Sequence, residues 1–277
     1  MLRLLTIEFH KLKHNTASKV LIIVYFTLIT LIALIAAIKF DIGPIQFHLA
    51  DMGIFNFPYI WHFNTFIAAL LKFFLLLVIV SMMANEYSYK TLKQNLIDGL
   101  SKKEFILSKF YTVIAFAFIS TVFIFLVSLI LGLFYSDYNE FAIITSDLEY
   151  LFAFFLKLVG FFSMGLFFGI LIKRSAFAVG GLIIYFFIEF FSYLYIAGSN
   201  RSQEFADSIY QFFPFKSLWN LIEEPFSRLG AVRSVASQVG ETFTKSYDVE
   251  FTTILIVSVW TYIFIYLSYA LLKKRDL

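Results

Sequence analysis

Six long apolar segments, separated by shorter polar stretches, constrain the fold of this chain more than any other feature of its sequence. Each segment has between 19 and 26 residues, and a helix needs about 20 mainly apolar residues to cross the hydrocarbon core of a bilayer. The segments cover residues 20–38, 63–83, 110–135, 150–172, 175–195 and 251–272. We therefore predict an all-α polytopic membrane protein with six transmembrane helices, forming one domain over residues 1–277.

The composition and the placement of the prolines support six uninterrupted helices. Hydrophobic residues make up 60% of the chain and charged residues 15%, which leaves a soluble domain too little polar surface to cover this apolar content. The segments are continuous, whereas the strands of a membrane β-barrel alternate over about 10 residues. All prolines lie outside the segments, at Pro44, Pro58, Pro214 and Pro225, and we expect unbroken spans for that reason.

The charges of the polar stretches alternate along the chain. Four stretches together contain 14 basic and five acidic residues: 1–19, 84–109, 173–174 and 273–277. The other three contain six basic and 13 acidic residues: 39–62, 136–149 and 196–250. Because basic loops stay on the cytoplasmic side of a membrane, both termini are predicted to be cytoplasmic. The small net charge of +3 thus reflects orientation in the lipid bilayer, and we expect no nucleic-acid partner.

The residues before the first span predict a short amphipathic helix. Its apolar stripe consists of Leu2, Leu5, Phe9 and Leu12. Such a helix would lie at the inner interface of the membrane, and simple anchoring to anionic lipid explains it equally well. The first span itself follows a 19-residue charged leader and has a 19-residue apolar core. A cleavable signal peptide has a core of about 7–15 residues, so we favour a retained span.

Residues 86–109 form the cytoplasmic stretch with the strongest helix signals. Apolar residues recur there at spacings of three and four, namely Tyr89, Leu92, Leu96 and Leu100, which is typical of one face of a helix. Gly99 suits the left-handed residue that ends a helix, and Ser101 with Glu104 has the pattern of a capping box that begins the next one. We predict a helix, a tight turn and a second helix that enters the third span. This defined shape favours a docking surface over a lipid anchor.

These residues carry a resemblance to the permease subunits of type-2 ATP-binding-cassette (ABC) transporters, an ABC-2-like exporter family. The family pattern is a glutamate after the second span, a Gly/Lys-Thr, a small residue, an aliphatic residue, serine and a basic residue, and a lysine at the next span. The matching residues are Glu86, Lys90, Thr91, Gly99, Leu100, Ser101, Lys102 and Lys109. The usual Gly-Thr is Lys90-Thr91 here, and a frequent proline is Gly99. The basic tail at 273–277 is also similar to the C-terminus of the family.

The resemblance implies a transport function that depends on other chains. It implies that residues 86–109 are a coupling helix that docks into a separate cytoplasmic ABC ATPase subunit, and that a second permease copy or a related permease pairs with this chain. It further implies export from the cytoplasm across a bacterial cytoplasmic (inner) membrane. The ATPase-docking residues would be Glu86, Lys90, Thr91, Leu92, Leu96, Gly99, Leu100, Ser101, Lys102 and Glu104.

The sequence contains no signature of catalysis or of nucleotide binding. The phosphate-loop pattern Gly-x-x-x-x-Gly-Lys-Ser/Thr is missing, so we expect no cofactor in this chain, with ATP and magnesium bound by the partner ATPase. Cysteine is absent, which excludes thiolate metal sites. His10 and His14 have the spacing of a helical metal-binding pair, but more often such a pair is solvated. We therefore expect neither a metal site nor an enzyme.

Three ionisable residues interrupt the apolar spans: Lys72, Lys157 and Glu189. Such groups cost about 2.5–3.5 kcal/mol on insertion scales and tend to face the interior of a helix bundle. All three are expected at a similar depth, so we hypothesise that Glu189 pairs with Lys157 or Lys72. The alternative is that both lysines extend outward to the headgroups.

The fourth span carries three glycines, Gly160, Gly165 and Gly169. Small residues let helix backbones approach closely. We expect close packing within one subunit, with a dimer contact as the alternative.

The outer stretch 196–250 is too long for a simple connection. Its mixture of aromatic and charged residues predicts short helices at the outer interface, with Trp219 at headgroup depth. The resemblance implies re-entrant helices between the fifth and sixth spans, so the stretch is either a gate of the exit or an ordered lid.

Two other functions remain open beside an ABC permease. A secondary transporter would have internal repeats and helices broken near the midplane of the membrane, and neither is evident in the sequence. A membrane scaffold or assembly factor that transports nothing would need no coupling helix.

Overall fold

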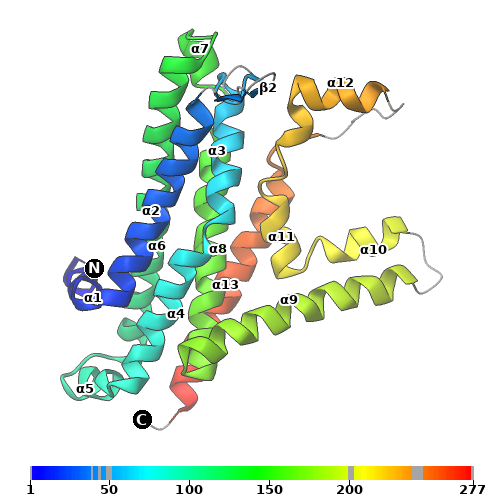
Figure 1. Ribbon diagram of the computed structural model, residues 1–277. Helices are drawn as coiled ribbons and strands as arrows, with labels where there is room; N and C mark the ends of the chain where they lie inside the picture. The colour runs from blue at the N-terminus through cyan, green and yellow to red at the C-terminus, as the bar shows by residue number, and fades with distance from the viewer. Residues whose placement is uncertain are drawn as a thin grey trace.

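The computed structural model describes residues 2–38, 40–42, 45–47, 52–198, 203–238 and 246–275 of the chain (Figure 1). Among these residues, five helices are long and apolar enough to cross a membrane, and a bent pair of helices supplies a sixth span. The five helices are α2 (Thr16–Ala37), α6 (Lys102–Tyr135), α8 (Glu149–Ile172), α9 (Ser175–Gly198) and α13 (Phe251–Lys274). The predicted all-α polytopic membrane fold is confirmed.

The second span differs from the prediction because it is broken. It consists of α3 (Tyr59–Leu70) and α4 (Phe73–Ser88), whose axes differ by 45°. At the break the backbone N–H groups of Leu71 and Phe74 donate to carbonyls three residues back instead of four, a local tightening of the helix. Proline and glycine are absent there, so the expectation of an unbroken span, which rested on proline, was wrong at Lys72.

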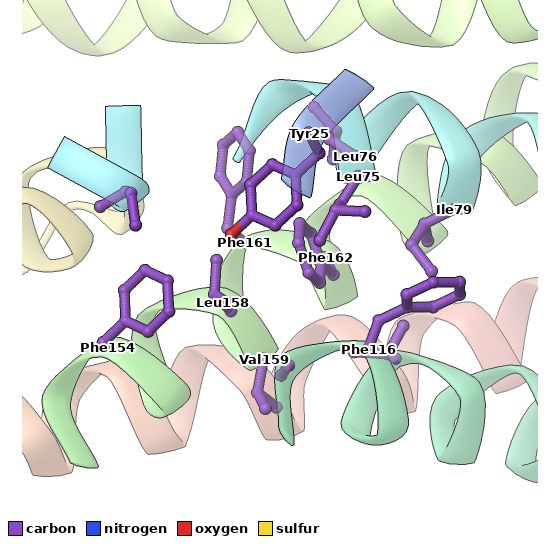
Figure 2. Packing of buried hydrophobic residues seen from close by; sticks show 14 of the residues in the cluster. Tyr25, Leu75, Leu76, Ile79, Phe116, Phe154, Leu158, Val159, Phe161 and Phe162 are labelled. Atoms are coloured by element: carbon purple, nitrogen blue, oxygen red, sulfur yellow. The ribbon is translucent and has the colours of Figure 1, made fainter. Parts of the chain in front are cut away.

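Helix α8 forms the centre of the bundle. In its most apolar 18-residue window 72% of the residues are buried, against 17–33% in the other unbroken spans. Figure 2 shows side chains of α4 and α8 facing one another, among them Leu76 and Phe161. A side chain at Gly165 would overlap Leu76, and a β-carbon at Gly169 would lie 3.2 Å from Met83. The glycines therefore let α4 approach α8 within one subunit, as the sequence predicts.

Two short helices lie toward one end of the bundle. They are α1 (Leu2–His14), which packs on α6 and α2, and α5 (Thr91–Ile97), which follows α4. Figure 1 shows them at the end where the C-terminus also lies. Asn15 separates α1 from α2, and its side chain caps α2 by accepting from the N–H of Ser18 at 3.0 Å. Helix α1 and the C-terminal end of α13 thus lie toward the same end of the bundle.

The outer stretches contain the remaining elements. The stretch 196–250 forms α10 (Gln203–Tyr210), α11 (Pro214–Asn220), the 3₁₀ helix η2 (Phe226–Arg228) and α12 (Gly230–Gln238), and the stretch 136–149 forms α7 (Phe141–Ile144). Short helices were expected here. A pair of antiparallel strands, β1 (Phe40–Ile42) and β2 (Ile45–Phe47), was not expected in an all-α chain.

The fifth span lies apart from the rest of the bundle. Helix α9 leans away from the other long helices, and α10 folds back along it (Figure 1). Helix α11 packs on α13 and α8 instead. The chain between α9 and α13 thus returns to the bundle before it reaches α12, which agrees with the re-entrant arrangement that the resemblance implies.

Candidate functional site

The stretch 86–109 has the helix, turn and helix that its sequence predicts. Helix α5 ends before Gly99, whose φ of +96° is left-handed, and α6 begins after Ser101. The hydroxyl of Ser101 accepts from the N–H of Glu104 at 3.2 Å, while the Ser101 N–H donates to the Glu104 carboxylate at 2.9 Å. The predicted capping box is therefore present.

A second left-handed residue begins α5. Lys90 has a φ of 57° and a ψ of 16°, a conformation that costs other residues about 1–2 kcal/mol and costs glycine almost nothing. Lys90 is also the position where the family pattern has Gly-Thr. A lysine therefore occupies a backbone conformation in this chain that glycine would adopt at lower cost.

A buried charge network connects this stretch to the first helix. It consists of Glu8 and Lys11 on α1, Glu86 on α4 and Lys109 on α6. The Lys109 ammonium lies 2.6 Å from Glu8 Oε2 and 2.5 Å from Glu86 Oε1, and the Lys11 ammonium lies 2.8 Å from Glu86 Oε1. Glu8 and Glu86 are each 2% exposed and Lys109 is 0% exposed. Two buried carboxylates are thus balanced by one buried ammonium group, on Lys109, and one partly exposed ammonium group, on Lys11.

Glu86 also holds the short helix α5. Its second carboxylate oxygen accepts from the Thr91 hydroxyl at 2.6 Å and from the Asn95 amide at 3.4 Å. One side chain therefore connects α1, α4, α5 and α6. Removing one member of a buried charge pair destabilises a protein by about 3–5 kcal/mol, because the remaining charge is left without a partner. The four helices are accordingly held as one unit.

The predicted docking residues divide by exposure. Glu86 and Leu92 are buried; Thr91, Leu96, Leu100 and Lys102 are partly buried; Lys90, Gly99, Ser101 and Glu104 are exposed. The buried members hold the stretch together from inside, and the exposed ones form its surface. Whether the surface binds an ATPase stays a prediction.

Two exposed apolar side chains belong to the same surface. Tyr89 is 73% exposed and Ile97 is 69% exposed. The sequence pattern placed Tyr89 on the same helix face as Leu92 and Leu96, but Tyr89 lies before α5 and does not share its buried face. Ile97 was not predicted to be a docking residue, because it lies outside the stripe of Leu92 and Leu96. Its position on the other side of a short helix was the signal that could have identified it.

The C-terminal end of the chain lies against the start of α6. The Lys102 ammonium donates to the carbonyl oxygens of Arg275 at 2.9 Å and Lys273 at 3.3 Å, a favourable place for a cation because the end of a helix carries partial negative charge. Arg275 in turn donates to the carbonyl oxygens of Ile170 at 2.5 Å and Leu171 at 2.9 Å. The basic tail thus connects α13 to α6 and α8. The last two residues of the predicted tail motif, 276–277, lie outside the described residues.

The three charges within the spans do not pair as hypothesised. No ion pair joins Glu189 to Lys72 or Lys157, all three of which the structure describes. Glu189 instead accepts from the backbone N–H of Phe215 at 3.0 Å and 3.2 Å. Phe215 lies in the first turn of α11, where N–H groups lack partners within the helix, and α9 leans away from the lysines. The hypothesis of a charge pair was therefore wrong.

The alternative, in which both lysine side chains extend outward to the headgroups, does not match the structure either. Lys157 is 2% exposed, and its ammonium group donates to the carbonyl oxygen of Ile222 at 3.3 Å. The Lys72 ammonium lies 4.8 Å above the ring of Phe161, a favourable contact of a cation with an aromatic face. Both lysines are thus directed toward other elements of the protein.

A polar cluster holds the outer stretch against the bundle. Arg228 Nη1 lies 3.1 Å from His62 Nδ1 on α3 and 3.3 Å from the Tyr150 hydroxyl on α8, and Arg228 Nη2 lies 3.6 Å from the Asp147 carboxylate. The rings of His62 and Tyr150 stack with centroids 4.2 Å apart, and the Tyr150 hydroxyl donates to the carbonyl oxygen of Tyr247 at 2.7 Å. We call Arg228, His62, Tyr150, Asp147 and Tyr247 the outer cluster. No sequence pattern predicts this cluster, because its members are far apart in the chain; Arg228 and His62, for example, are 166 residues apart.

The chain matches a known protein family, and comparison with curated proteins finds no match. The matching family is described as ABC-2 family transporter protein, and the match covers residues 12–277. It includes every predicted site residue and all of the spanning helices. The family consists of membrane permeases of ABC transporters, which agrees with the long apolar helices. The chain therefore belongs to the ABC-2 family of transporter proteins and is a multi-pass permease.

Proposed function

We propose that this chain is the permease subunit of an ATP-driven exporter in a bacterial cytoplasmic membrane, coupled through residues 86–109 to a separate cytoplasmic ABC ATPase. The family match supports the permease. The observation that carries the coupling is the buried charge network, because Glu86 joins α5 to three longer helices. A force applied to α5 would move α1, α4 and α6 together.

The exposed surface of the stretch suits a protein partner. Tyr89 and Ile97 are large apolar side chains in an otherwise polar cytoplasmic region, and Lys90 and Lys93 flank them. Interfaces of this kind combine a few apolar or aromatic anchors with a charged rim. We propose that Tyr89 and Ile97 are the anchors in the ATPase. ATP and magnesium would bind to that partner, and a second copy of this permease, or a related one, would complete the transporter.

The outer cluster would control the opposite end of the pathway. Arg228 holds the outer stretch to both α3 and α8. Movement of α3 relative to α8 would separate His62 from Tyr150 and release Arg228. We propose that the outer stretch is a gate that opens by this separation, and an ordered lid that stays closed is the alternative.

One observation favours a different class of function. Secondary transporters bind substrate where spanning helices are broken near the midplane, and α3–α4 is broken beside Lys72. Such a transporter would need no ATPase. The experiment below separates the two functions.

The test is purification of the tagged chain from its native membrane, followed by identification of bound proteins. We expect a stoichiometric partner that contains a phosphate loop and hydrolyses ATP. The double variant Tyr89→Glu/Ile97→Glu should lose this partner and still elute in size-exclusion chromatography as a folded permease. Tyr138→Glu is the matched control, because Tyr138 is 49% exposed and lies in the stretch 136–149, away from residues 86–109. Recovery of the folded chain without an ATPase would contradict the proposal and favour the secondary transporter.

A further inference from the structure

A large cavity lies between the leaning helix α9 and the rest of the bundle. Its volume is about 560 Å³, and residues of α4, α8, α9, α10 and α11 line it. The lining is mainly apolar and aromatic, including Leu76, Phe161, Leu182, Phe186, Phe215 and Trp219. This volume falls within the range of about 300–1,000 Å³ that is usual for small-molecule sites. The cavity therefore has the size and surface of a ligand site.

The cavity opens to the side of the bundle. Phe186 and Phe190 on α9 both line it, and they are 45% and 42% exposed. An apolar molecule dissolved in the membrane could therefore reach the cavity beside α9 without passing through water.

Two ammonium groups give the cavity its polar character. Lys72, at the break of the second span, and Lys216, on α11, both line it. In the described part of the chain, neither has a carboxylate within 4 Å, whereas Lys11, Lys109 and Arg228 each do. Each lies instead near an aromatic ring, with Lys72 4.8 Å from the Phe161 centroid and Lys216 5.9 Å from the Tyr210 centroid.

The acidic residue of α9 does not supply the missing charge. Glu189 lies on the helix that forms one wall, but it is absent from the cavity lining and binds the Phe215 N–H. Lys157 adds a further ammonium behind Trp219, at 5.7 Å from its ring centroid. The charged residues that line the cavity are thus both lysines, and a positive group in apolar surroundings is costly without a counter-charge.

We propose that this cavity binds an anionic amphiphile, a molecule with an apolar chain and a carboxylate or phosphate head group. The chain would lie against the phenylalanines of α8 and α9, and the head group between Lys72 and Lys216. The inference that this molecule is the exported cargo rests on the proposed function; the binding itself does not. A lipid of the bilayer has the same chemistry, so the test must separate a cargo from a resident lipid.

The binding test uses Trp219 as a reporter in the full chain, purified in a neutral detergent. A brominated fatty acid is titrated in, and quenching of tryptophan fluorescence is measured. We expect saturable quenching that Trp219→Phe largely removes, and at least tenfold weaker affinity in Lys72→Gln/Lys216→Gln. The matched control is Lys93→Gln, an exposed cytoplasmic lysine, which should keep the affinity. Equal affinity in the double variant, or for a choline-headed analogue of the same chain, would overturn the proposal.

A second arm distinguishes the cargo from a resident lipid. The fatty acid is added to the purified complex of permease and ATPase, and ATP hydrolysis is measured. Stimulation that the Lys72→Gln/Lys216→Gln variant loses would support a cargo; binding without stimulation would overturn the cargo assignment and leave a lipid site. Because the first arm needs no ATPase, failure of the proposed function and failure of the site give different results.

Discussion

The ammonium of Lys109 lies 2.5 Å from the carboxylate of Glu86, and both side chains are buried. The two residues bracket the stretch 86–109, since Glu86 lies in the last turn of α4 and Lys109 lies in α6. Their contact closes the stretch into a loop with fixed ends. Residues 90–104 therefore extend from a rigid base.

Replacement of Lys109 by alanine should destabilise the permease more than any exposed substitution in the stretch. Glu8 and Glu86 would then lie buried with only the partly exposed Lys11 as a counter-charge, and the expected loss is about 3–5 kcal/mol. Thermal unfolding in detergent, followed by size-exclusion chromatography after heating, measures it. Lys103→Ala is the control because Lys103 is exposed one position after the start of the same helix. Equal thermal stability of the two variants would show that the network contributes little.

Replacement of Lys90 by glycine should stabilise the stretch. Its left-handed backbone, with φ of 57°, favours glycine by about 1 kcal/mol. The matched variant Lys93→Gly, inside α5, should lower stability by a similar amount of about 1 kcal/mol, since glycine is a poor helix former. Denaturation midpoints of the two variants should therefore move in opposite directions. A shift in the same direction for both would mean that the charge of Lys90, rather than its backbone, determines its contribution.

Gly165 and Gly180 should respond differently to alanine. A β-carbon at Gly165 would overlap the side chain of Leu76, whereas a β-carbon at Gly180 would have no described neighbouring atom within 4 Å. Gly165→Ala should cost about 1–3 kcal/mol through overpacking, and Gly180→Ala on α9 should gain up to about 1 kcal/mol from helix propensity. Thermal stability of the two purified variants provides the comparison. A neutral Gly165→Ala would imply that α4 and α8 can separate without cost.

Arg228→Gln should release the outer stretch. The variant loses the contacts with His62, Tyr150 and Asp147, so the segment near the exposed Arg233 should be cleaved several-fold faster by trypsin. Glu204→Gln, on the exposed face of α10, is the control and should keep the original rate. ATP hydrolysis of the complex then separates a gate from a lid: a changed rate in Arg228→Gln supports the gate, and an unchanged rate supports the lid. Unchanged cleavage would show that the outer cluster does not hold the stretch.

Local sequence signals predicted the local structure of this protein well. The length of each apolar segment specifies a spanning helix, since the bilayer leaves the backbone few other ways to form its hydrogen bonds. The capping box at Ser101 and Glu104 and the left-handed Gly99 depend on residues within one turn, and both are present. Such features need no knowledge of the rest of the fold.

Features that join distant parts of the chain were not predictable in the same way. Lys109 is 101 residues from Glu8, and Arg228 is 166 residues from His62, so no spacing rule connects them. The pairing of Glu189 with a lysine was predicted from depth in the membrane alone. Glu189 binds backbone N–H groups at the start of α11 instead, and the position of α11 beside Glu189 could not be predicted from the sequence. The break at Lys72 had no helix-breaking residue to mark it. In each case packing between helices determined the outcome.

The charge network also has a consequence for the synthesis of the chain. Glu8 and Glu86 leave the ribosome before Lys109, so every nascent chain passes through a stage with both carboxylates and only Lys11 among the four network residues. Products that stop between Glu86 and Lys109 keep this imbalance. Packing of α6 against α1 and α4 ends it by bringing Lys109 beside both carboxylates. A chain that extends through α6 therefore differs from a shorter one in the charge balance of its N-terminal half.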